Sequence, residues 1–270
     1  RHMSWLHCMW GVGASAGPVI MGWALAGGSW QSGYRIISVL QFALTAVLLF
    51  SLRLWKRPEA AAIDGAALTH HSIPELLRRP GVPQVLICFW CYCALEATAG
   101  MWAASYCTLV RGIDAGTAAG WASTFYLGIT IGRGVCGFLT IKINDQNMIR
   151  LGQVLIALGV VLVLLPAGQG VLFAGLVTIG LGCAPVYPSI IHETPANFGR
   201  EVSLAMTGIQ MAFAYVGSCL MPPLFGLLAQ YVTPALYPWF LAALLALMFA
   251  MAESLHRRTR EKRRAVETGR

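Results

Sequence analysis

Two ionisable side chains, Glu96 and Arg133, lie deep inside long apolar stretches of the sequence. Glu96 is near the middle of the run 82–108, where a charged group costs on the order of 3 kcal/mol if that run crosses a membrane. Such groups usually face a cavity or relay protons, because burial disfavours their charged form. Tyr92 precedes Glu96 by four residues and so shares its helical face. We expect Glu96 to be a proton-coupling residue held by Tyr92, and a neutral packing acid is the alternative.

Aromatic and amide side chains supply further groups that could hold a small polar solute. Sugars bind to aromatic faces and to paired hydrogen-bond donors and acceptors. Trp102 and Tyr106 share a face with each other, but not with Glu96 unless the helix breaks near Gly100. Packing or an interfacial position is the alternative for each aromatic residue. The expected solute-binding residues are Tyr92, Glu96, Trp102, Tyr106, Gln210 and Tyr215.

Other patterns have the residue types of catalytic or metal sites but lack the spacing. His192 and Glu193 begin like a zinc-protease helix, but the second histidine is missing and Pro195 is expected to break the helix. Cysteines at 88, 91 and 93 lie close together, yet three thiols on one apolar helix do not close a tetrahedral site. Short glycine pairs lack the strand and acidic residue of a dinucleotide site. The sequence predicts no enzyme, no metal and no cofactor.

The composition defines the medium in which these side chains must work. Of the 270 residues, 57% are apolar and 11% charged, whereas soluble domains carry about a quarter charged residues. A chain this apolar cannot cover its surface with polar groups, so we expect a membrane protein. Nucleic-acid binding is therefore a poor explanation for the net charge of +8. All 8 cysteines fall in apolar runs and are expected to pack as small core residues.

Eight apolar segments are long enough to cross a bilayer, since about 30 Å of hydrocarbon needs about 20 helical residues. They predict an all-α membrane protein with eight transmembrane helices. Short, turn-like connections join most of them, and the exception is the stretch from about 55 to 81. The predicted spans are 5–27, 35–54, 82–108, 117–139, 148–166, 170–190, 202–229 and 234–255.

Lysine and arginine residues concentrate on one side of these predicted spans. That side holds 17 of the 19, because only Arg35 and Arg111 fall on the other. The side richer in lysine and arginine faces the cytoplasm in most multi-span proteins. We therefore expect both termini and the 55–81 linker to be cytoplasmic. The basic tail 257–270 is expected to anchor this orientation, and contact with anionic lipid is the alternative.

An internal repeat relates the beginning of the chain to its end. Residues 12–22 (VGASAGPVIMG) and 216–226 (VGSCLMPPLFG) share Val, Gly, Pro and Gly in register. Two related halves joined by a long linker are typical of repeat-built transporters. Residues 1–54 would then be the last two helices of one half-bundle, and 82–256 the six-helix second half-bundle. Four further helices would precede them, which makes the chain the C-terminal two thirds of a twelve-span protein.

Two glycine-rich motifs resemble those of a known family, the major facilitator superfamily. Residues 13–18 (GASAGP) are similar to the glycine-proline motif of its fifth helix, although a single Gly22 replaces the usual pair. Residues 128–137 (GITIGRGVCG), with the charged residues that follow, are similar to the second copy of its cytoplasmic gating motif. The resemblance implies a gating ion pair between Arg133 and Asp145, and an interface anchor is the alternative for Arg133.

A third stretch points to one branch of that family. The run 182–199 (GCAPVYPSIIHETPANFG), with 208–215 (GIQMAFAY), is similar to the fucose:proton symporter-like branch. The resemblance implies a twelve-helix fold of two bundles. It also implies that the third and sixth helices of this chain correspond to the seventh and tenth of the family, which line the central cavity.

These observations together predict a secondary active transporter for a small polar solute, such as a sugar. We expect proton-coupled symport by alternating access, with the solute, protons and the lipid bilayer as partners. The expected location is a bacterial cytoplasmic membrane, and the expected state is a monomer. An efflux antiporter of the same superfamily and a non-transporting membrane receptor or scaffold are the alternatives. Substrate identity and the direction of coupling are left open by the sequence.

Overall fold

The computed structural model describes residues 29–54 and 72–267, with positions 9, 11–14, 16–17, 20–21, 23–24 and 27. Throughout these residues the chain forms helices and turns and no strand, which confirms the all-α prediction. They divide into two compact units, residues 13–71 and a larger unit that includes residues 72–270.

The smaller unit contains one long described helix, α2 (Trp30–Ser51), which continues into the short 3-10 helix η1 (Leu52–Leu54). The Ser29 side chain caps the start of α2 by accepting a hydrogen bond from the Ser32 backbone N–H at 3.4 Å. Within α2 only Gly33 is buried, and the helix is long and apolar enough to cross a membrane. Nearly half of the residues of the predicted span 5–27, and most of the linker, lie outside the described residues.

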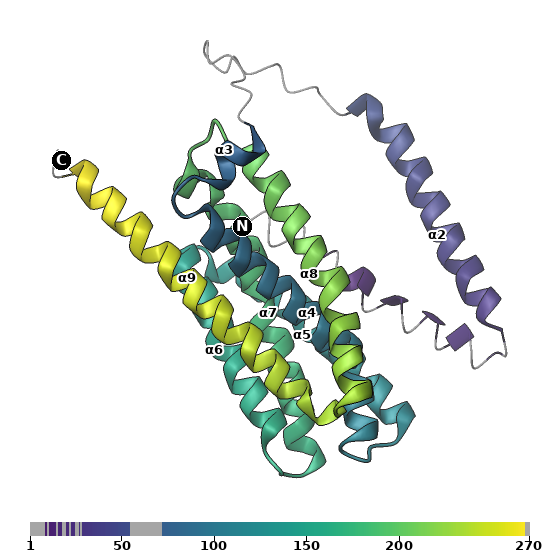
Figure 1. Cartoon of the computed structure of the whole chain (residues 1–270). Coiled ribbons are helices and arrows are strands. Elements are labelled where there is room, and N and C mark those ends of the chain that lie inside the picture. The colour runs from purple at the N-terminus through teal and green to yellow at the C-terminus, as the bar shows by residue number, and fades with distance from the viewer. Residues whose placement is uncertain are drawn as a thin grey trace. The chain divides into compact units, whose positions relative to one another are not determined.

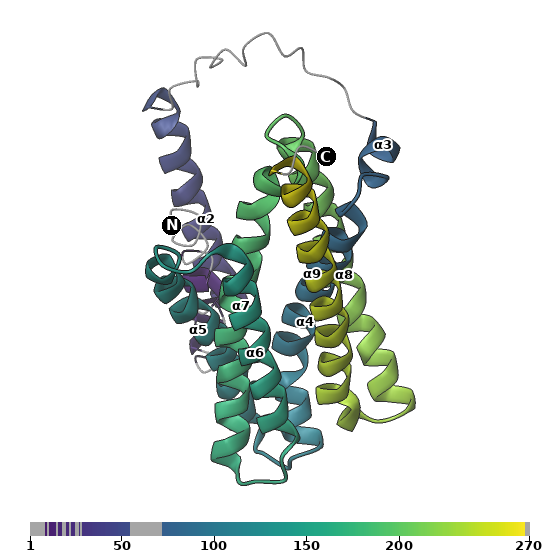
Figure 2. The same ribbon diagram turned by 90° about the vertical axis from the view of Figure 1, so that its left-hand side faces the viewer.

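The larger unit is a bundle of long helices joined by short connections (Figures 1 and 2). α6 and α5 both pack on α7, while α4 packs on α8 and α9. A short helix, α3 (Ile73–Leu77), precedes the bundle, and η2 (Pro234–Leu236) links α8 to α9. The long helices are α4 (Val82–Leu109), α5 (Ala115–Leu139), α6 (Asp145–Leu164), α7 (Gln169–Phe198), α8 (Ser203–Tyr231) and α9 (Tyr237–Glu267).

One end of this bundle is basic. Because successive helices alternate in direction, the starts of α4, α6 and α8 and the ends of α5, α7 and α9 lie at the same end. We call it the basic end after four exposed side chains, Lys142, Arg200, Arg257 and Arg258. It corresponds to the side that the charge count assigns to the cytoplasm.

The predicted spans from residue 35 onwards agree with the helices, with one difference in composition and two in length. Among the described residues, six helices are long and apolar enough to cross a membrane, and α5 is not one of them. α5 forms where 117–139 was predicted, but Arg133 and several glycines lower its apolarity. α7 and α9 continue well past the predicted ends at 190 and 255, because a helix need not stop where the hydrocarbon stops.

Small residues let α7 approach its neighbours closely. A Cβ atom added at Gly128 of α5 would lie 2.9 Å from the backbone carbonyl oxygen of Val177, and one at Gly152 of α6 would lie 2.6 Å from that of Gly182. Close helix contact of this kind is a main source of stability in lipid. The expectation that Pro195 breaks the helix is wrong, since α7 runs on to Phe198. A proline so near the C-terminus removes only one backbone hydrogen bond.

Candidate functional site

Four helices of the larger unit line a partly open cavity of about 510 Å³. Its wall combines a carboxylate, a guanidinium, three phenols and a hydroxyl with apolar side chains. The lining residues are Cys93, Glu96, Ala97 and Met101 of α4, Tyr126 and Arg133 of α5, Tyr187 of α7, and Met211, Ala214, Tyr215 and Ser218 of α8.

An ion pair between neighbouring helices lies at this cavity. Arg133 Nη2 of α5 is 3.6 Å from Glu96 Oε2 of α4, and the two side chains are 3% and 15% exposed. The predicted role of Tyr92 as the holder of this carboxyl group is supported, since its hydroxyl hydrogen-bonds the Glu96 carboxylate. A buried arginine is costly unless a counter-charge accompanies it, and Glu96 provides that charge.

The Tyr92 hydroxyl also connects this pair to α7. It lies 2.9 Å from the backbone carbonyl oxygen of Cys183 as well as within hydrogen-bonding distance of Glu96. A phenol carries one hydrogen, and a carbonyl oxygen can only accept. When Glu96 is ionised, Tyr92 can donate to the carboxylate. When Glu96 is protonated, the acid can donate to Tyr92, whose own hydrogen is then free for Cys183.

Aromatic rings form the rest of the polar wall. The Tyr187 ring packs on Phe89 at a centroid distance of 4.9 Å and meets Tyr92 edge-on at 6.2 Å. Its hydroxyl approaches Met211 Sδ at 3.1 Å. These contacts fix the ring at the edge of the cavity, so a solute would meet a preformed surface.

Three of the predicted solute-binding residues lie away from this cavity. Trp102 Nε1 donates to the Pro222 carbonyl oxygen at 3.0 Å. The Tyr106 ring stacks on Tyr237 at a centroid distance of 5.0 Å. Gln210 is fully buried and accepts from Thr194 Oγ1 at 3.0 Å. α4 is continuous through Gly100, so no break turns its outer half towards Glu96. Glu96 and Tyr215 line the cavity, and Tyr92 lies directly behind it.

The structure gives Arg133 and Asp145 different partners from the ones expected. Arg133 is 2% exposed and pairs inward with Glu96, whereas Asp145 Oδ2 lies 2.7 Å from His192 Nδ1. The expectation of an ion pair between Arg133 and Asp145 is therefore wrong. The reason is that Arg133 points into the bundle, while Asp145 begins α6 at the basic end.

Sequence reasoning missed Tyr126, Tyr187, Met211 and Ser218 as cavity residues. Tyr126 precedes Arg133 by seven residues, which is two helical turns, so the shared face was a usable signal. Met211 and Ser218 lie four residues before and three after Tyr215, again on one face. No comparable signal marked Tyr187, because its place depends on how α7 packs against α4.

The family model of the Major Facilitator Superfamily matches residues 1–191 and 111–270, which together cover the whole chain. The chain belongs to the major facilitator superfamily. The family that the motifs resemble is thus confirmed. No curated protein sequence matches this superfamily member significantly.

Two solved structures share the superfamily fold. A crystal structure of a variant of the E. coli fucose:proton symporter FucP has a TM-score of 0.67 at 17% identity, over 84% of this chain and 56% of that chain. A major facilitator superfamily transporter, FucP, in the outward conformation gives 0.61 at 19% identity, over 83% and 54%. The chain therefore spans little more than half the length of these neighbours. At such identity the likeness shows the fold, and it confirms the predicted fold class.

Proposed function

We propose that the protein is a secondary active transporter that carries a small polar solute, a sugar, together with a proton across a bacterial cytoplasmic membrane. The observation that carries the proposal is the cavity of about 510 Å³ at which Glu96 meets Arg133. Membership of the superfamily supports alternating access, in which two half-bundles rock around a central site. No enzymatic step is part of the proposal.

Protonation of Glu96 would change what Arg133 can bind. While Glu96 is ionised, its carboxylate balances the guanidinium 3.6 Å away. A protonated Glu96 no longer does so, and it no longer competes with the hydroxyl oxygens of a solute for the positive charge of Arg133. Proton binding and solute binding then favour each other. Such reciprocal coupling between two ligands is the thermodynamic requirement for symport.

The aromatic wall supports a sugar as the solute. Tyr126, Tyr187 and Tyr215 offer ring faces to its C–H surfaces, and Ser218 adds a hydroxyl that can donate or accept. A volume of about 510 Å³ falls in the range of roughly 300–1,000 Å³ typical of small-molecule pockets. A cationic solute would suit this wall less well, because Arg133 carries a positive charge in both states of Glu96.

An efflux antiporter of the same superfamily is the second candidate. Antiport needs the proton and the substrate to compete, as a cationic substrate would compete for Glu96. Arg133 disfavours a cation at that carboxylate. A receptor or scaffold would gain nothing from an ion pair placed in a membrane, where ionisable groups are costly.

The test is solute uptake by the purified full-length protein, with the four helices expected to precede this chain, in proteoliposomes with an imposed pH gradient. We expect at least one monosaccharide to accumulate when the outside is more acidic, and a proton ionophore to abolish accumulation. If an organic cation moves in the direction opposite to the protons, driven by the same gradient, the protein is an antiporter and not a symporter. Failure to move either class of solute would support the receptor or scaffold.

We further propose that the basic end and the tail face the cytoplasm. Single cysteines introduced at Ala61 and Thr268 in a cysteine-free background are expected to react with an impermeant thiol reagent only after the membrane is opened. Labelling of either position in intact cells would reverse the orientation.

A further inference from the structure

A second hollow lies on helices that contribute nothing to the cavity at Glu96. One face of α6 from Gln153 to Leu164 and one face of α9 from Ala242 to Phe249 form an open groove of about 400 Å³. Every lining side chain except Gln153 is apolar. Two of them, Val154 and Val161, are more than half exposed. We call this hollow the α6–α9 groove.

Gln153 is the unusual member of the groove. The residue is 2% exposed, and neither its Nε2 nor its Oε1 has a hydrogen-bond partner within the described part of the chain. An unpaired buried amide costs about 1–3 kcal/mol. In hydrocarbon no water relieves this cost, so a bound molecule with a hydrogen-bonding group at this depth would relieve it.

The α6–α9 groove continues towards the basic end along the same face of α9. Phe249 borders both this groove and a neighbouring hollow lined by Ala250, Glu253, Ser254, Arg257 and Arg258. Both arginines are exposed.

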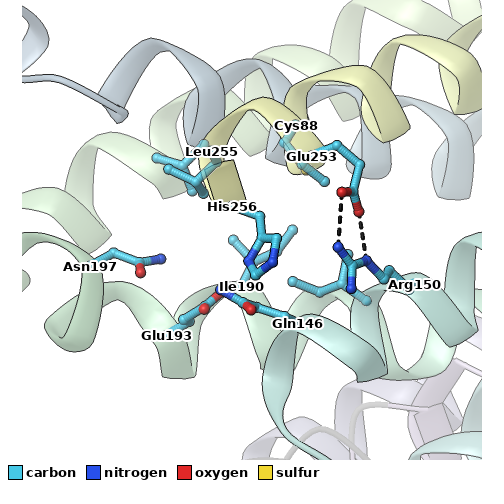
Figure 3. A pocket seen from close by; sticks show the side chains of 12 residues that line it. Cys88, Gln146, Arg150, Ile190, Glu193, Asn197, Glu253, Leu255 and His256 are labelled. Carbon is cyan, nitrogen blue, oxygen red and sulfur yellow. Dashed lines mark hydrogen bonds and ion pairs between the residues drawn. The ribbon is translucent and has the colours of Figure 1, made fainter. Parts of the chain in front are cut away.

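Glu253, the acidic residue of the hollow next to the α6–α9 groove, is neutralised by an ion pair. Arg150 of α6 holds Glu253 of α9 through two contacts, Nε to Oε1 at 2.6 Å and Nη2 to Oε2 at 2.8 Å, as Figure 3 shows. The charge presented to a ligand at this end is therefore that of the two arginines.

Polarity changes along the face in the order that an anionic phospholipid requires. Arg257 lies eight residues beyond Phe249, which is about 12 Å along the helix. Gln153 lies about one helical turn further along α6 from the basic end than Arg150 does. Basic groups come first, then one amide, then an apolar channel. A phosphate, an ester carbonyl and an acyl chain follow one another in the same order.

We propose that α6 and α9 bind one anionic phospholipid, with its phosphate at Arg257 and Arg258 and one acyl chain in the α6–α9 groove. The Gln153 amide donates to an ester carbonyl at the top of that chain. A zwitterionic lipid would fill the groove equally well but would gain less from the arginines.

Native mass spectrometry of the purified, delipidated protein in detergent tests the proposal. We expect dioleoyl phosphatidylglycerol to bind about thirty-fold more tightly than dioleoyl phosphatidylcholine, from two arginines near the membrane surface. The double variant Arg257→Gln, Arg258→Gln should lose this preference. The matched control Lys142→Gln, Arg200→Gln removes two exposed charges from the same end and should keep it. Equal binding of the two lipids by the unaltered protein would overturn the proposal.

The amide contact is tested with an ether-linked phosphatidylglycerol, which lacks the carbonyl. The unaltered protein should bind the ester lipid about five-fold more tightly than the ether lipid. Gln153→Leu should abolish that difference and keep the preference for the anionic head group. Ala246→Trp, which fills the apolar part, should weaken both lipids. Binding that depends on the arginines but not on Ala246 or Gln153 would leave only charge attraction and contradict a groove site.

Discussion

The cavity at Glu96 and the α6–α9 groove bury polar groups in opposite ways. At the cavity, Glu96 pairs with Arg133 of the neighbouring helix and with Tyr92 of its own helix. In the groove, the Gln153 amide has no partner among the described residues. One proton can change the contacts among the paired groups, because a protonated Glu96 no longer balances the charge of Arg133. An unpaired amide cannot switch, and it stabilises whatever molecule brings its partner.

Removing one member of the charged pair should have the largest effect. Arg133→Gln leaves Glu96 without its counter-charge, and breaking a buried ion pair costs about 3–5 kcal/mol. The double variant Glu96→Gln, Arg133→Gln removes both charges and should recover most of that stability, although it should not transport. Thermal unfolding of the purified protein measures both. Arg200→Gln, at an exposed position, is the control and should change little.

If Arg133→Gln alone unfolds like the unaltered protein, the ion pair does not stabilise the bundle. If the double variant is no more stable than the single one, Arg133 acts through contacts other than the charge of Glu96.

Substitutions of aromatic residues should have effects of intermediate size, and the half-saturation concentration for solute should distinguish cavity residues from packing residues. Tyr215 lines the cavity and is 69% exposed, so Tyr215→Ala should raise the half-saturation concentration for solute about ten-fold. Trp102→Phe loses the hydrogen bond to Pro222 but should leave that concentration unchanged. Initial uptake rates over a solute series give both values. A larger change for Trp102→Phe than for Tyr215→Ala would restore Trp102 as a solute contact.

The smallest predicted effect is a gain in stability, whereas breaking the ion pair should lower stability. Gln153→Leu replaces an unpaired buried amide with an apolar side chain of similar size, so it should stabilise the delipidated protein by about 1 kcal/mol. Gln230→Leu, at an exposed position of α8, is the matched control. Thermal unfolding in detergent without added lipid makes the comparison. A loss of stability in Gln153→Leu would mean that the amide is satisfied within the protein.

Local patterns allowed part of this account to be predicted from the sequence. The contact between Tyr92 and Glu96 follows from their four-residue spacing, and the helices follow from apolar runs of membrane length. Motif resemblance was sufficient for the family, which the family model confirms.

Contacts between helices could not be predicted in this way. Arg133 pairs with Glu96 rather than Asp145 because of the rotation of α5 within the bundle, which one sequence does not specify. The same applies to Tyr187, whose neighbours Phe89 and Tyr92 come from another helix. Trp102 and Tyr106 have residue types suited to sugars, but their faces meet other helices.

The most direct test of proton coupling is the Glu96→Gln variant of the full-length protein in proteoliposomes, with Glu201→Gln as an exposed control. Glutamine keeps the shape and much of the hydrogen bonding of glutamate but fixes a neutral state. We predict that the Glu96 variant loses accumulation driven by a pH gradient and largely retains counterflow exchange, in which no net proton movement is needed. If it still concentrates solute with the pH dependence of the unaltered protein, Glu96 does not couple the proton and the central claim is wrong.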